Sequence, residues 1–269
     1  AVHERPVGVP PVRVRVGEVH DMRTAVDPLD AYAAATEALV ARARAGDRAA
    51  FTSYVLRDTS SQPVDMEPLH REMLRFVDGC WRDGKHAGVL AAWRHGKTLL
   101  LVEGVALQEI GLNSNVRIRV ISGDDQEAMK RVSSVRRFIS SGEYRLVFPH
   151  IGPAPARESE WTKHSIYVER TSKGRDPTLS AAGVLTGEAG GGYDIIMFDD
   201  IVTFRNSELS PKTRAEVFEA VPQVWLQRVD PHSRVLLVGT RWVFDDAYGK
   251  LGAPSLGGGL CGGAPQFAN

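Results

Sequence analysis

Beyond Gly84, short apolar runs alternate with longer stretches of helical spacing, and this alternation constrains the fold more than any other feature. We expect strands over the runs at 87–93, 116–122, 165–170, 194–200 and 233–240, and helices over 97–110, 125–141 and 210–228. Strands that are separated by helices favour parallel pairing. The sequence therefore predicts an α/β fold with a largely parallel sheet and helices on both faces.

The segments that flank this alternation have other patterns. Helices are expected over 27–46, where Asp27 suits an N-cap and Gly46 a stop, and over 67–83. Valine and arginine alternate over 12–16, which fits an edge strand or an unpacked arm equally well. Glycine is frequent after residue 250. We expect an N-terminal arm over 1–26, a helical extension packed on the core over 27–84, the core over 85–250, and a linker or tail over 251–269.

The segment AAWRHGKT, residues 91–98, lies between an expected strand and an expected helix. A turn there directs backbone N–H groups and a helix N-terminus toward an anion. Gly96 would let the backbone approach a phosphate, Lys97 would reach the β- and γ-phosphates, and Thr98 would offer its hydroxyl to Mg²⁺. These residues therefore predict a nucleotide site.

Other residues of the same loop bear on this prediction. Ala91 stands where the strict motif has its first glycine, so a chance Gly-Lys-Thr at a helix start is the alternative. Arg94 and His95 favour the nucleotide interpretation, because two potential cations beside the loop suit a polyphosphate.

Two aspartates directly follow the apolar run at 195–198. Ligands of open α/β sheets bind at the carboxyl ends of the strands, where these side chains are expected to lie. Asp199 would hold Mg²⁺ directly or through water, and Asp200 would orient or deprotonate an attacking water. The alternative is a turn with two exposed acids.

A further strand runs into Thr240, Arg241 and Trp242. If this strand lies beside the one before the phosphate loop, Thr240 would hydrogen-bond the γ-phosphate or its water. Arg241 and Trp242 would then report the nucleotide state to a moving part. A simple strand-to-loop exit with Trp242 in the core is an equal alternative.

The helix expected over 125–141 carries four basic residues away from its apolar face: Lys130, Arg131, Arg136 and Arg137. The formal net charge of the chain is +0, so nucleic-acid contact depends on such local patches. These side chains would follow a DNA backbone, or one would act on a neighbouring subunit's nucleotide; a solvated helix face is the alternative. The sequence carries no zinc-finger, helix-turn-helix or RNA-binding signature, which argues against sequence-specific reading.

Three segments together resemble the ATPase domain of the large terminase subunit of tailed double-stranded DNA phages. They are WRHGKT at 93–98, AAGVLTGEAGGGYDIIMFDDIV at 181–202 and SRVLLVGTRWVFDDAYGK at 233–250. The upstream MEPLHREML at 66–74 is similar to the Pro-x-His helix of this family. The resemblance covers roughly 60–250, and the order and spacing of its motifs are more specific than each motif alone.

The resemblance implies a P-loop NTPase core of the RecA-like ASCE class, with ATP and Mg²⁺ as cofactors. The implied function is a motor that hydrolyses ATP to drive double-stranded DNA into a procapsid. Lys97 and Thr98 would be the phosphate and metal contacts, Asp199 the metal acid, and residues 240–242 the coupling motif. The expected catalytic set is Lys97, Asp200, Arg94 and Thr240, and the expected nucleotide contacts are Trp93, Arg94, His95, Gly96, Lys97, Thr98 and Gln62.

The resemblance also implies partners and a location. They are double-stranded DNA, a portal protein, a small terminase subunit and identical subunits in a pentameric ring, in the cytoplasm of an infected bacterium. We expect no membrane association, because no apolar run approaches the roughly 20 residues that span a bilayer. The family's nuclease domain has no room after about residue 250, so we expect the motor half alone.

Several residues depart from the family pattern or leave its assignments open. Asp200 stands where many members have glutamate, so another acid such as Glu188 is an alternative base. Trp93 occupies the position where some members have an arginine, which leaves the role of Arg94 open. Gln62 and His70 lie where this family contacts adenine, and a plain surface role is the alternative for both.

Two other functions fit the same motifs. A helicase or translocase of the superfamily-2 type shares the loop, the acid pair and the polar strand end, but it needs a second RecA-like domain. A nucleotide-inert assembly subunit is the other alternative, which the substitution at Ala91 motivates.

Overall fold

The computed structural model describes residues 27–154, 161–186, 191–207, 210–242 and 248. The chain divides into two compact units, Ala1–Thr36 and Glu37–Asn269, and the division falls within helix α1 (Pro28–Arg44). In the first unit, the Leu29 N–H donates to Asp27 Oδ1 at 2.8 Å, so Asp27 caps α1. The arm expected over 1–26, with its alternating segment at 12–16, and the tail expected over 251–269 lie outside the described residues.

The described strands form one sheet within the second unit, in the order β1-β6-β5-β2-β4-β3. Five of them run parallel: β1 (Ala87–Leu90), β2 (Ile118–Ser122), β4 (Leu179–Gly183), β5 (Tyr193–Asp199) and β6 (Val229–Gly239). The short edge strand β3 (Ser165–Ile166) is antiparallel to β4. The predicted α/β class with a largely parallel sheet is confirmed.

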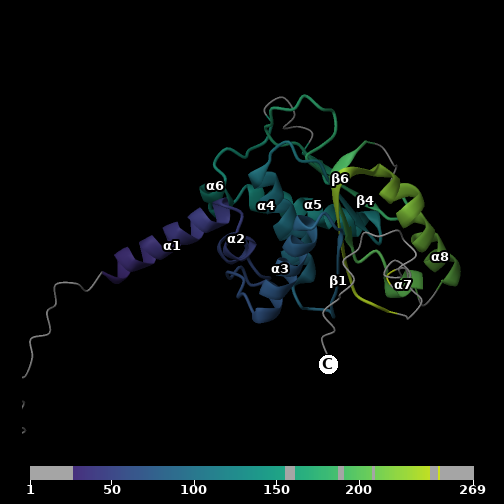
Figure 1. Ribbon diagram of the computed structural model, residues 1–269, viewed down its shortest axis with the longest axis horizontal. Helices are drawn as coiled ribbons and strands as arrows, with labels where there is room; N and C mark the ends of the chain where they lie inside the picture. The colour runs from purple at the N-terminus through teal and green to yellow at the C-terminus, as the bar shows by residue number, and fades with distance from the viewer. Residues whose placement is uncertain (1–26, 155–160, 187–190, 208–209, 243–247, 249–269) are drawn as a thin grey trace, which may run out of the picture. The chain divides into compact units, whose positions relative to one another are not determined.

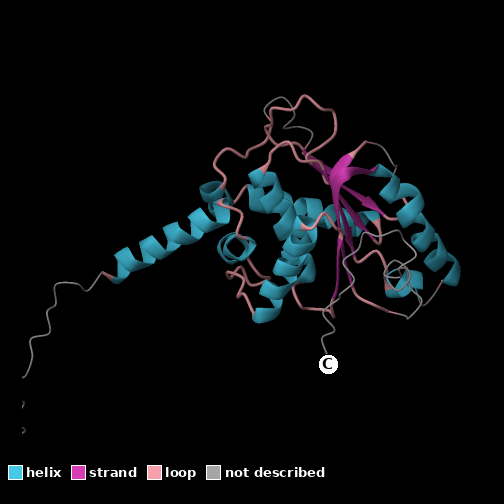
Figure 2. Cartoon of the chain, in the orientation of Figure 1, coloured by secondary structure: helices cyan, strands magenta, loops and turns pink. Residues whose placement is uncertain are grey.

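Helices of the second unit cover both faces of this sheet, as Figure 1 and Figure 2 show. One face carries α2 (Arg48–Val55), α3 (Pro68–Arg82), a π-helical segment η2 (Thr98–Gly104) that continues as α4 (Val105–Leu112), α5 (Asp125–Ile139) and α6 (Gly142–Val147). The other face carries α7 (Phe204–Ser207) and α8 (Pro211–Ala220), which continues through η4 (Val221–Trp225) and η5 (Leu226–Arg228). None of the described helices is long and apolar enough to cross a membrane.

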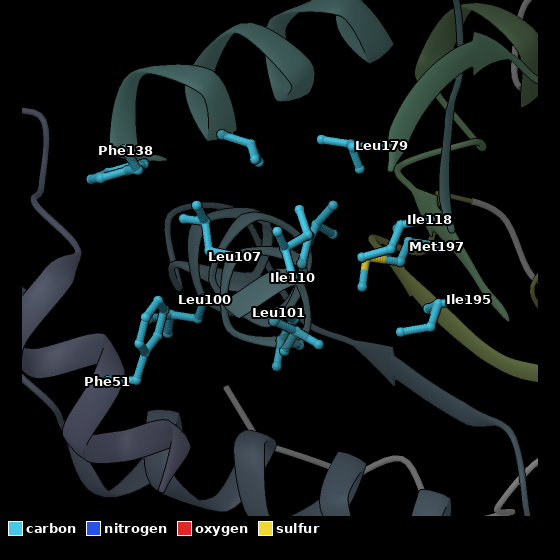
Figure 3. Packing of buried hydrophobic residues seen from close by; sticks show 14 of the residues in the cluster. Phe51, Leu100, Leu101, Leu107, Ile110, Ile118, Phe138, Leu179, Ile195 and Met197 are labelled. Atoms are coloured by element: carbon cyan, nitrogen blue, oxygen red, sulfur yellow. The ribbon is translucent and has the colours of Figure 1, made fainter. Parts of the chain in front are cut away.

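The two faces have separate cores because side chains alternate along each strand. On β5, Ile195 and Met197 pack with the first group of helices, whereas Ile196 and Phe198 pack with the second. Figure 3 shows the first core, in which residues of η2 and α4 face the sheet. Each fully buried large aliphatic side chain stabilises the fold by about 1.5–3 kcal/mol.

Strand β4 was not expected from the sequence, because Leu-Ser-Ala-Ala-Gly has few β-branched or aromatic residues. Small side chains are needed there, since the N-terminus of α5 approaches the strand closely. A Cβ at Gly183 would lie 2.9 Å from the Asp125 backbone nitrogen, and Asp125 Oδ1 accepts the Gly183 N–H at 2.7 Å. Close helix packing, rather than strand propensity, therefore determines this segment.

Other local expectations also differ from the structure, since the strand expected over 87–93 ends at Leu90 and α6 and α7 were not expected. The strand expected over 165–170 is wrong beyond Ile166, and Val168 makes only an isolated bridge to Pro153. Helix α2 was not expected; it begins just after Gly46, whose φ of 99° ends α1. Asp47 then caps α2 by accepting the Ala50 N–H at 2.9 Å.

Candidate functional site

One edge of the sheet brings together segments that are far apart in the sequence. Strands β1, β6 and β5 are neighbours, and Leu90 pairs with Gly239 while Asp199 pairs with Val238 at their carboxyl ends. Thr240 follows β6, and its hydroxyl donates to the Ala91 carbonyl at 3.1 Å. The loop at 91–98, the two aspartates and Thr240 therefore share this edge.

The loop at 91–98 has left-handed backbone at two positions. Gly96 has a φ of 69°, and a Cβ there would lie 3.2 Å from Leu100 Cδ1 and 3.6 Å from His70 Nε2. Arg94 has a φ of 65°, a conformation that costs a non-glycine residue about 1–2 kcal/mol. Strain of this kind is concentrated at ligand-binding loops, which makes the loop a candidate site.

A histidine ring braces the same loop. His95 Nδ1 lies 2.9 Å from the Trp93 carbonyl oxygen and 3.3 Å from that of Ala92. Because carbonyl oxygens only accept, Nδ1 carries a proton in this arrangement. His95 and Arg94 are both exposed beside the loop.

The buried ammonium group of Lys97 pairs with the second aspartate. Lys97 Nζ lies 3.2 Å from Asp200 Oδ2, and the lysine side chain is 7% exposed. Asp200 has a φ of 45°, and its N–H donates to the Val238 carbonyl at 2.9 Å. Its Oδ1 atom is buried without a hydrogen-bond partner among the described residues, so a further donor or cation would be stabilised there.

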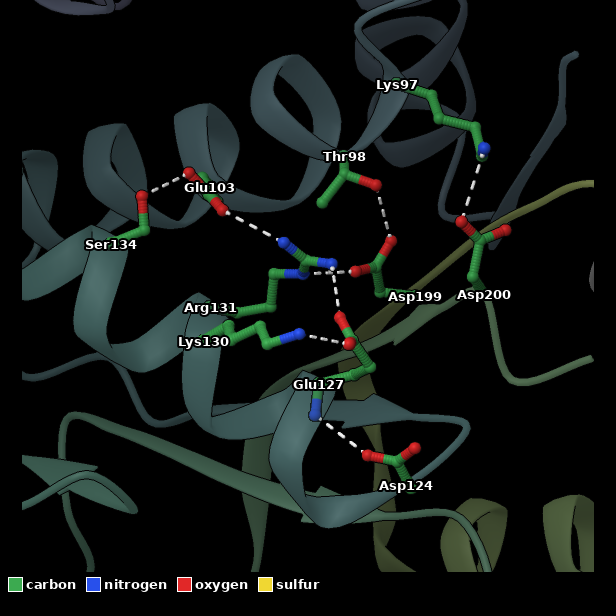
Figure 4. Close-up of polar contacts among 10 residues, drawn as sticks. All are labelled: Lys97, Thr98, Glu103, Asp124, Glu127, Lys130, Arg131, Ser134, Asp199 and Asp200. Carbon is green, nitrogen blue, oxygen red and sulfur yellow. Dashed lines mark hydrogen bonds and ion pairs between the residues drawn. The ribbon is translucent and has the colours of Figure 1, made fainter. Parts of the chain in front are cut away.

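Asp199 is the most enclosed acid at this edge, with 1% exposure. Figure 4 shows it between Thr98 and Arg131. Thr98 Oγ1 donates to its Oδ1 at 2.9 Å, and Arg131 Nε donates to its Oδ2 at 2.7 Å. Burial raises the pKa of Asp199 above its ordinary value; Arg131 lowers it in part, and Asp200 raises it further. The carboxylate is thus held between the loop at 91–98, whose last residue is Thr98, and helix α5.

Sequence reasoning missed a second buried acid beside this pair. Glu103 on η2 accepts a hydrogen bond from Ser134 Oγ at 2.6 Å, and its Oε1 lies 3.6 Å from Arg131 Nη1. Burial raises the pKa of Glu103, which the contacts with Ser134 and Arg131 oppose. A single acid inside the apolar run at 98–107 was the available signal, because a buried carboxylate requires a partner.

Two cavities lie on either side of Arg131, which lines both. The smaller, of about 530 Å³, is lined by Trp93, Gly123, Glu127, Arg131, Asp199, Asp200, Val202, Thr203, Phe204 and Trp242. The larger, of about 820 Å³, lies between η2, α5 and residues 57–59, and Thr98 lines it too. We call it the basic groove; its charged residues are Arg57, Asp58, Glu103, Lys130, Arg131, Arg137 and Lys163.

Aromatic rings form one wall of the smaller cavity. The Trp93 and Trp242 rings meet edge to face with centroids 5.3 Å apart, and the Phe204 ring lies 5.7 Å from that of Trp242. Trp93 is 61% exposed and Phe204 is 49% exposed. The loop at 91–98 and the segment after β6 are therefore in direct contact.

The four basic residues predicted on one face of α5 have different surroundings. Arg131, expected away from the apolar face of its helix, extends its guanidinium to Asp199 at the end of β5. Arg136 donates to the Trp161 carbonyl oxygen at 3.1 Å, and its guanidinium lies over the Trp161 ring. Lys130 pairs with Glu127, and Arg137 Nη2 lies 3.5 Å from Ser134 Oγ.

The other residues predicted to belong to the site differ in whether they lie near the loop at 91–98. His70 lies against the loop, since its Nε2 is close to Gly96. The backbone of Gln62 closes a turn with Asp58, whose N–H donates to the Gln62 carbonyl at 2.8 Å. Arg241 is exposed, and Glu188 lies outside the described residues.

The polar groups at this edge are suited to a phosphate group together with a divalent cation that prefers oxygen ligands. Lys97 and the backbone of the loop at 91–98 suit an anion, and the Thr98 and Asp199 oxygens suit Mg²⁺. Across the described part of the chain, no group of three or more His, Cys, Asp or Glu side chains is arranged to hold a metal ion. Mg²⁺ commonly takes only one or two protein ligands and completes its shell with phosphate and water, so this donor set is compatible with it.

Comparisons with known proteins reveal similarity to a solved structure but to no described family. No protein-family model and no curated protein matches the chain. Among solved structures, the chain is similar to the crystal structure of the HK97 bacteriophage large terminase, at 11% sequence identity and a TM-score of 0.49. The match covers 79% of this chain and 39% of that chain, so it spans well under half of the terminase's length.

Proposed function

We propose that this chain is the ATP-hydrolysing motor domain of a phage large terminase subunit, which translocates double-stranded DNA into a procapsid. One observation carries the proposal: Thr98 Oγ1 lies 2.9 Å from Asp199 Oδ1 while Lys97 Nζ lies 3.2 Å from Asp200 Oδ2. In P-loop enzymes the loop lysine holds the β- and γ-phosphates, while the loop Ser or Thr and an acid at a strand end hold Mg²⁺, and these two contacts place the corresponding residues together. The interposed strand β6, which separates β1 from β5, supports the RecA-like class.

Each residue of the site would have a distinct part in hydrolysis. Bound Mg²⁺ neutralises charge on the β- and γ-phosphates. Lys97 would hold those phosphates, and Thr98 and Asp199 would hold the cation. Asp200 would orient the attacking water and accept its proton, and its buried unpaired Oδ1 supports this role.

The decisive experiment for this proposal is Lys97→Ala. We expect ATP hydrolysis to fall by about 100-fold or more, because electrostatic stabilisation of the transferring group supplies about that much in comparable sites. A coupled assay of phosphate release measures the rate. The control is Lys212→Ala, since that side chain is 88% exposed on α8 and pairs only with Glu216 among the described residues.

The same preparation gives a second measurement. Mg-ATP at about 100 times its Kd should stabilise the parent by about 2.7 kcal/mol, seen as a rise in Tm. A Lys97→Ala variant that hydrolyses ATP at the parent's rate contradicts the proposal. A parent whose Tm does not rise with millimolar Mg-ATP favours the nucleotide-inert assembly subunit instead.

A further inference from the structure

Arg131 lies at the centre of three carboxylates from three different elements (Figure 4). Its guanidinium is 2.7 Å from Asp199 on β5, 3.4 Å from Glu127 on α5 and 3.6 Å from Glu103 on η2. The arginine side chain is only 23% exposed, and those of Asp199 and Glu103 are 1% and 7% exposed. The guanidinium therefore compensates the charge of two buried carboxylates, Asp199 and Glu103, and of the more exposed Glu127.

The contacts at Asp199 differ in whether they are compatible with a divalent cation. The Thr98 hydroxyl donates its proton to Oδ1 and keeps its oxygen lone pairs, so it remains a ligand for a cation. The guanidinium at Oδ2 is positively charged and has donors only. Like charges repel strongly in a poorly solvated site, so Arg131 and a divalent cation compete for Asp199.

Glu103 and Glu127 offer the guanidinium other partners. Both already lie within 4 Å of Arg131, so a small side-chain movement toward them needs no rearrangement of α5. We propose that Arg131 is the internal counter-ion of Asp199, and that a divalent cation displaces it toward Glu103 and Glu127. Arg131 then stabilises the fold and lowers the cation affinity of the site, and it is a positioning residue rather than a catalytic one.

This inference rests on the proposed function only for the assignment of Asp199 as the metal acid. The test uses Mn²⁺, which prefers the same oxygen ligands as Mg²⁺ and is detected by electron paramagnetic resonance, without added nucleotide. Arg131→Gln should bind Mn²⁺ about tenfold tighter or more. An opposite charge at this distance alters a carboxylate's affinity for a proton by about 10- to 1000-fold, and the cation should respond in the same sense.

A second variant should change the Mn²⁺ affinity in the opposite direction. Glu103→Gln keeps the shape of the side chain but removes one carboxylate to which Arg131 would move, so Mn²⁺ should bind more weakly than in the parent. The matched control is Arg117→Gln, which releases Asp194 at the other end of β5 from a 2.9 Å ion pair. That control should bind Mn²⁺ like the parent.

The outcomes separate this inference from the proposed function. Unchanged or weaker Mn²⁺ binding in Arg131→Gln overturns the inference, whether or not the protein hydrolyses ATP. If Arg131→Gln does not fold, tighter or unchanged binding in Glu103→Gln overturns it alone. If Arg131→Gln gains affinity, and Arg131→Gln combined with Asp199→Asn loses that gain, the inference holds even where Mg-ATP has no effect on Tm.

Discussion

The Glu109 carboxylate lies between two guanidinium groups beneath the sheet. Arg48 Nη2 donates to its Oε1 and Arg234 Nη2 to its Oε2, each at 2.6 Å. Burial alone would raise the pKa of Glu109, but the two arginines outweigh burial and hold that pKa below its ordinary value. The ion pairs join α2, α4 and β6, so they connect the N-terminal helices to the sheet.

Glu109→Gln should reduce the free energy of unfolding by about 3–5 kcal/mol at neutral pH, since breaking a buried ion pair leaves charges uncompensated. As the pH falls, the Glu109 carboxylate is protonated at a higher pH in the unfolded chain than in the folded chain. The difference in unfolding free energy between the parent and Glu109→Gln is therefore complete above about pH 4.3. It disappears as the pH falls through the lowered pKa of Glu109 in the folded chain. Urea unfolding across this range measures it.

The control for this prediction is Asp83→Asn. Asp83 is 62% exposed and its carboxylate is 4.0 Å from Lys85, so the change should stay within about 0.5 kcal/mol. An unfolding free energy for Glu109→Gln that matches this control would show that the buried pairs contribute no net stability.

Individual residues differ in how far their positions follow from sequence. Lys97, Thr98 and both aspartates were expected at one edge, because a turn after a strand and acids at a strand end have fixed places in a parallel sheet. The contact of Arg131 with Asp199 was not expected. Helical periodicity gives the direction of the Cα–Cβ bond of Arg131, but it does not say where the end of so long a side chain lies. The attraction of Asp199 decided its conformation.

At the scale of elements, the loop before η2 and the segment after β6 are linked through tryptophan rings. The edge-to-face contact of Trp93 with Trp242 joins the two segments beyond the hydrogen bond from Thr240 to Ala91. Such a pair is worth about 0.5–1.5 kcal/mol beyond the area it buries. We propose that this link transmits a movement of the loop to the segment after β6.

A double-mutant cycle tests this link. Trp93→Ala and Trp242→Ala should together destabilise the protein by about 0.5–1.5 kcal/mol less than the sum of the single changes, because the contact is lost only once. The matched cycle pairs Trp93→Ala with Leu146→Ala, since Leu146 is an exposed residue of α6. Additivity in the tryptophan cycle would refute the contact.

Elements were easiest to anticipate where local pattern and tertiary context agree. The helix at 125–139 follows from its helical periodicity, and the strand at 193–199 from its continuous apolar run. Strand β4 does not, because close packing against α5 determines it, and the helical pattern of 97–110 gives no sign that η2 is π-helical. The strand expected at 165–170 has a suitable composition, but only two of its residues pair with the edge of the sheet.

At the scale of the whole molecule, the formal net charge is +0, so any contact with DNA would depend on local concentrations of basic residues. The basic groove concentrates Arg57, Lys130, Arg131, Arg137 and Lys163 against the acids Asp58 and Glu103. Helix α5 supplies three of these cations, and through Arg131 it also contacts Asp199. The basic groove and the proposed nucleotide site therefore share one helix, which makes the groove the DNA-binding surface we propose to test.

If DNA phosphates bind in the groove, Lys130→Gln combined with Arg137→Gln should weaken DNA binding at any sequence. Each lost phosphate contact reduces the slope of log Kobs against log salt by about 0.9, so the double variant should lose about 1.8. Fluorescence anisotropy with two unrelated duplexes across a salt series measures both effects. Lys85→Gln with Lys212→Gln removes the same charge at exposed sites outside the groove and should keep the parent's slope. An equal loss of slope in both double variants would assign the DNA contact to total charge and exclude the groove.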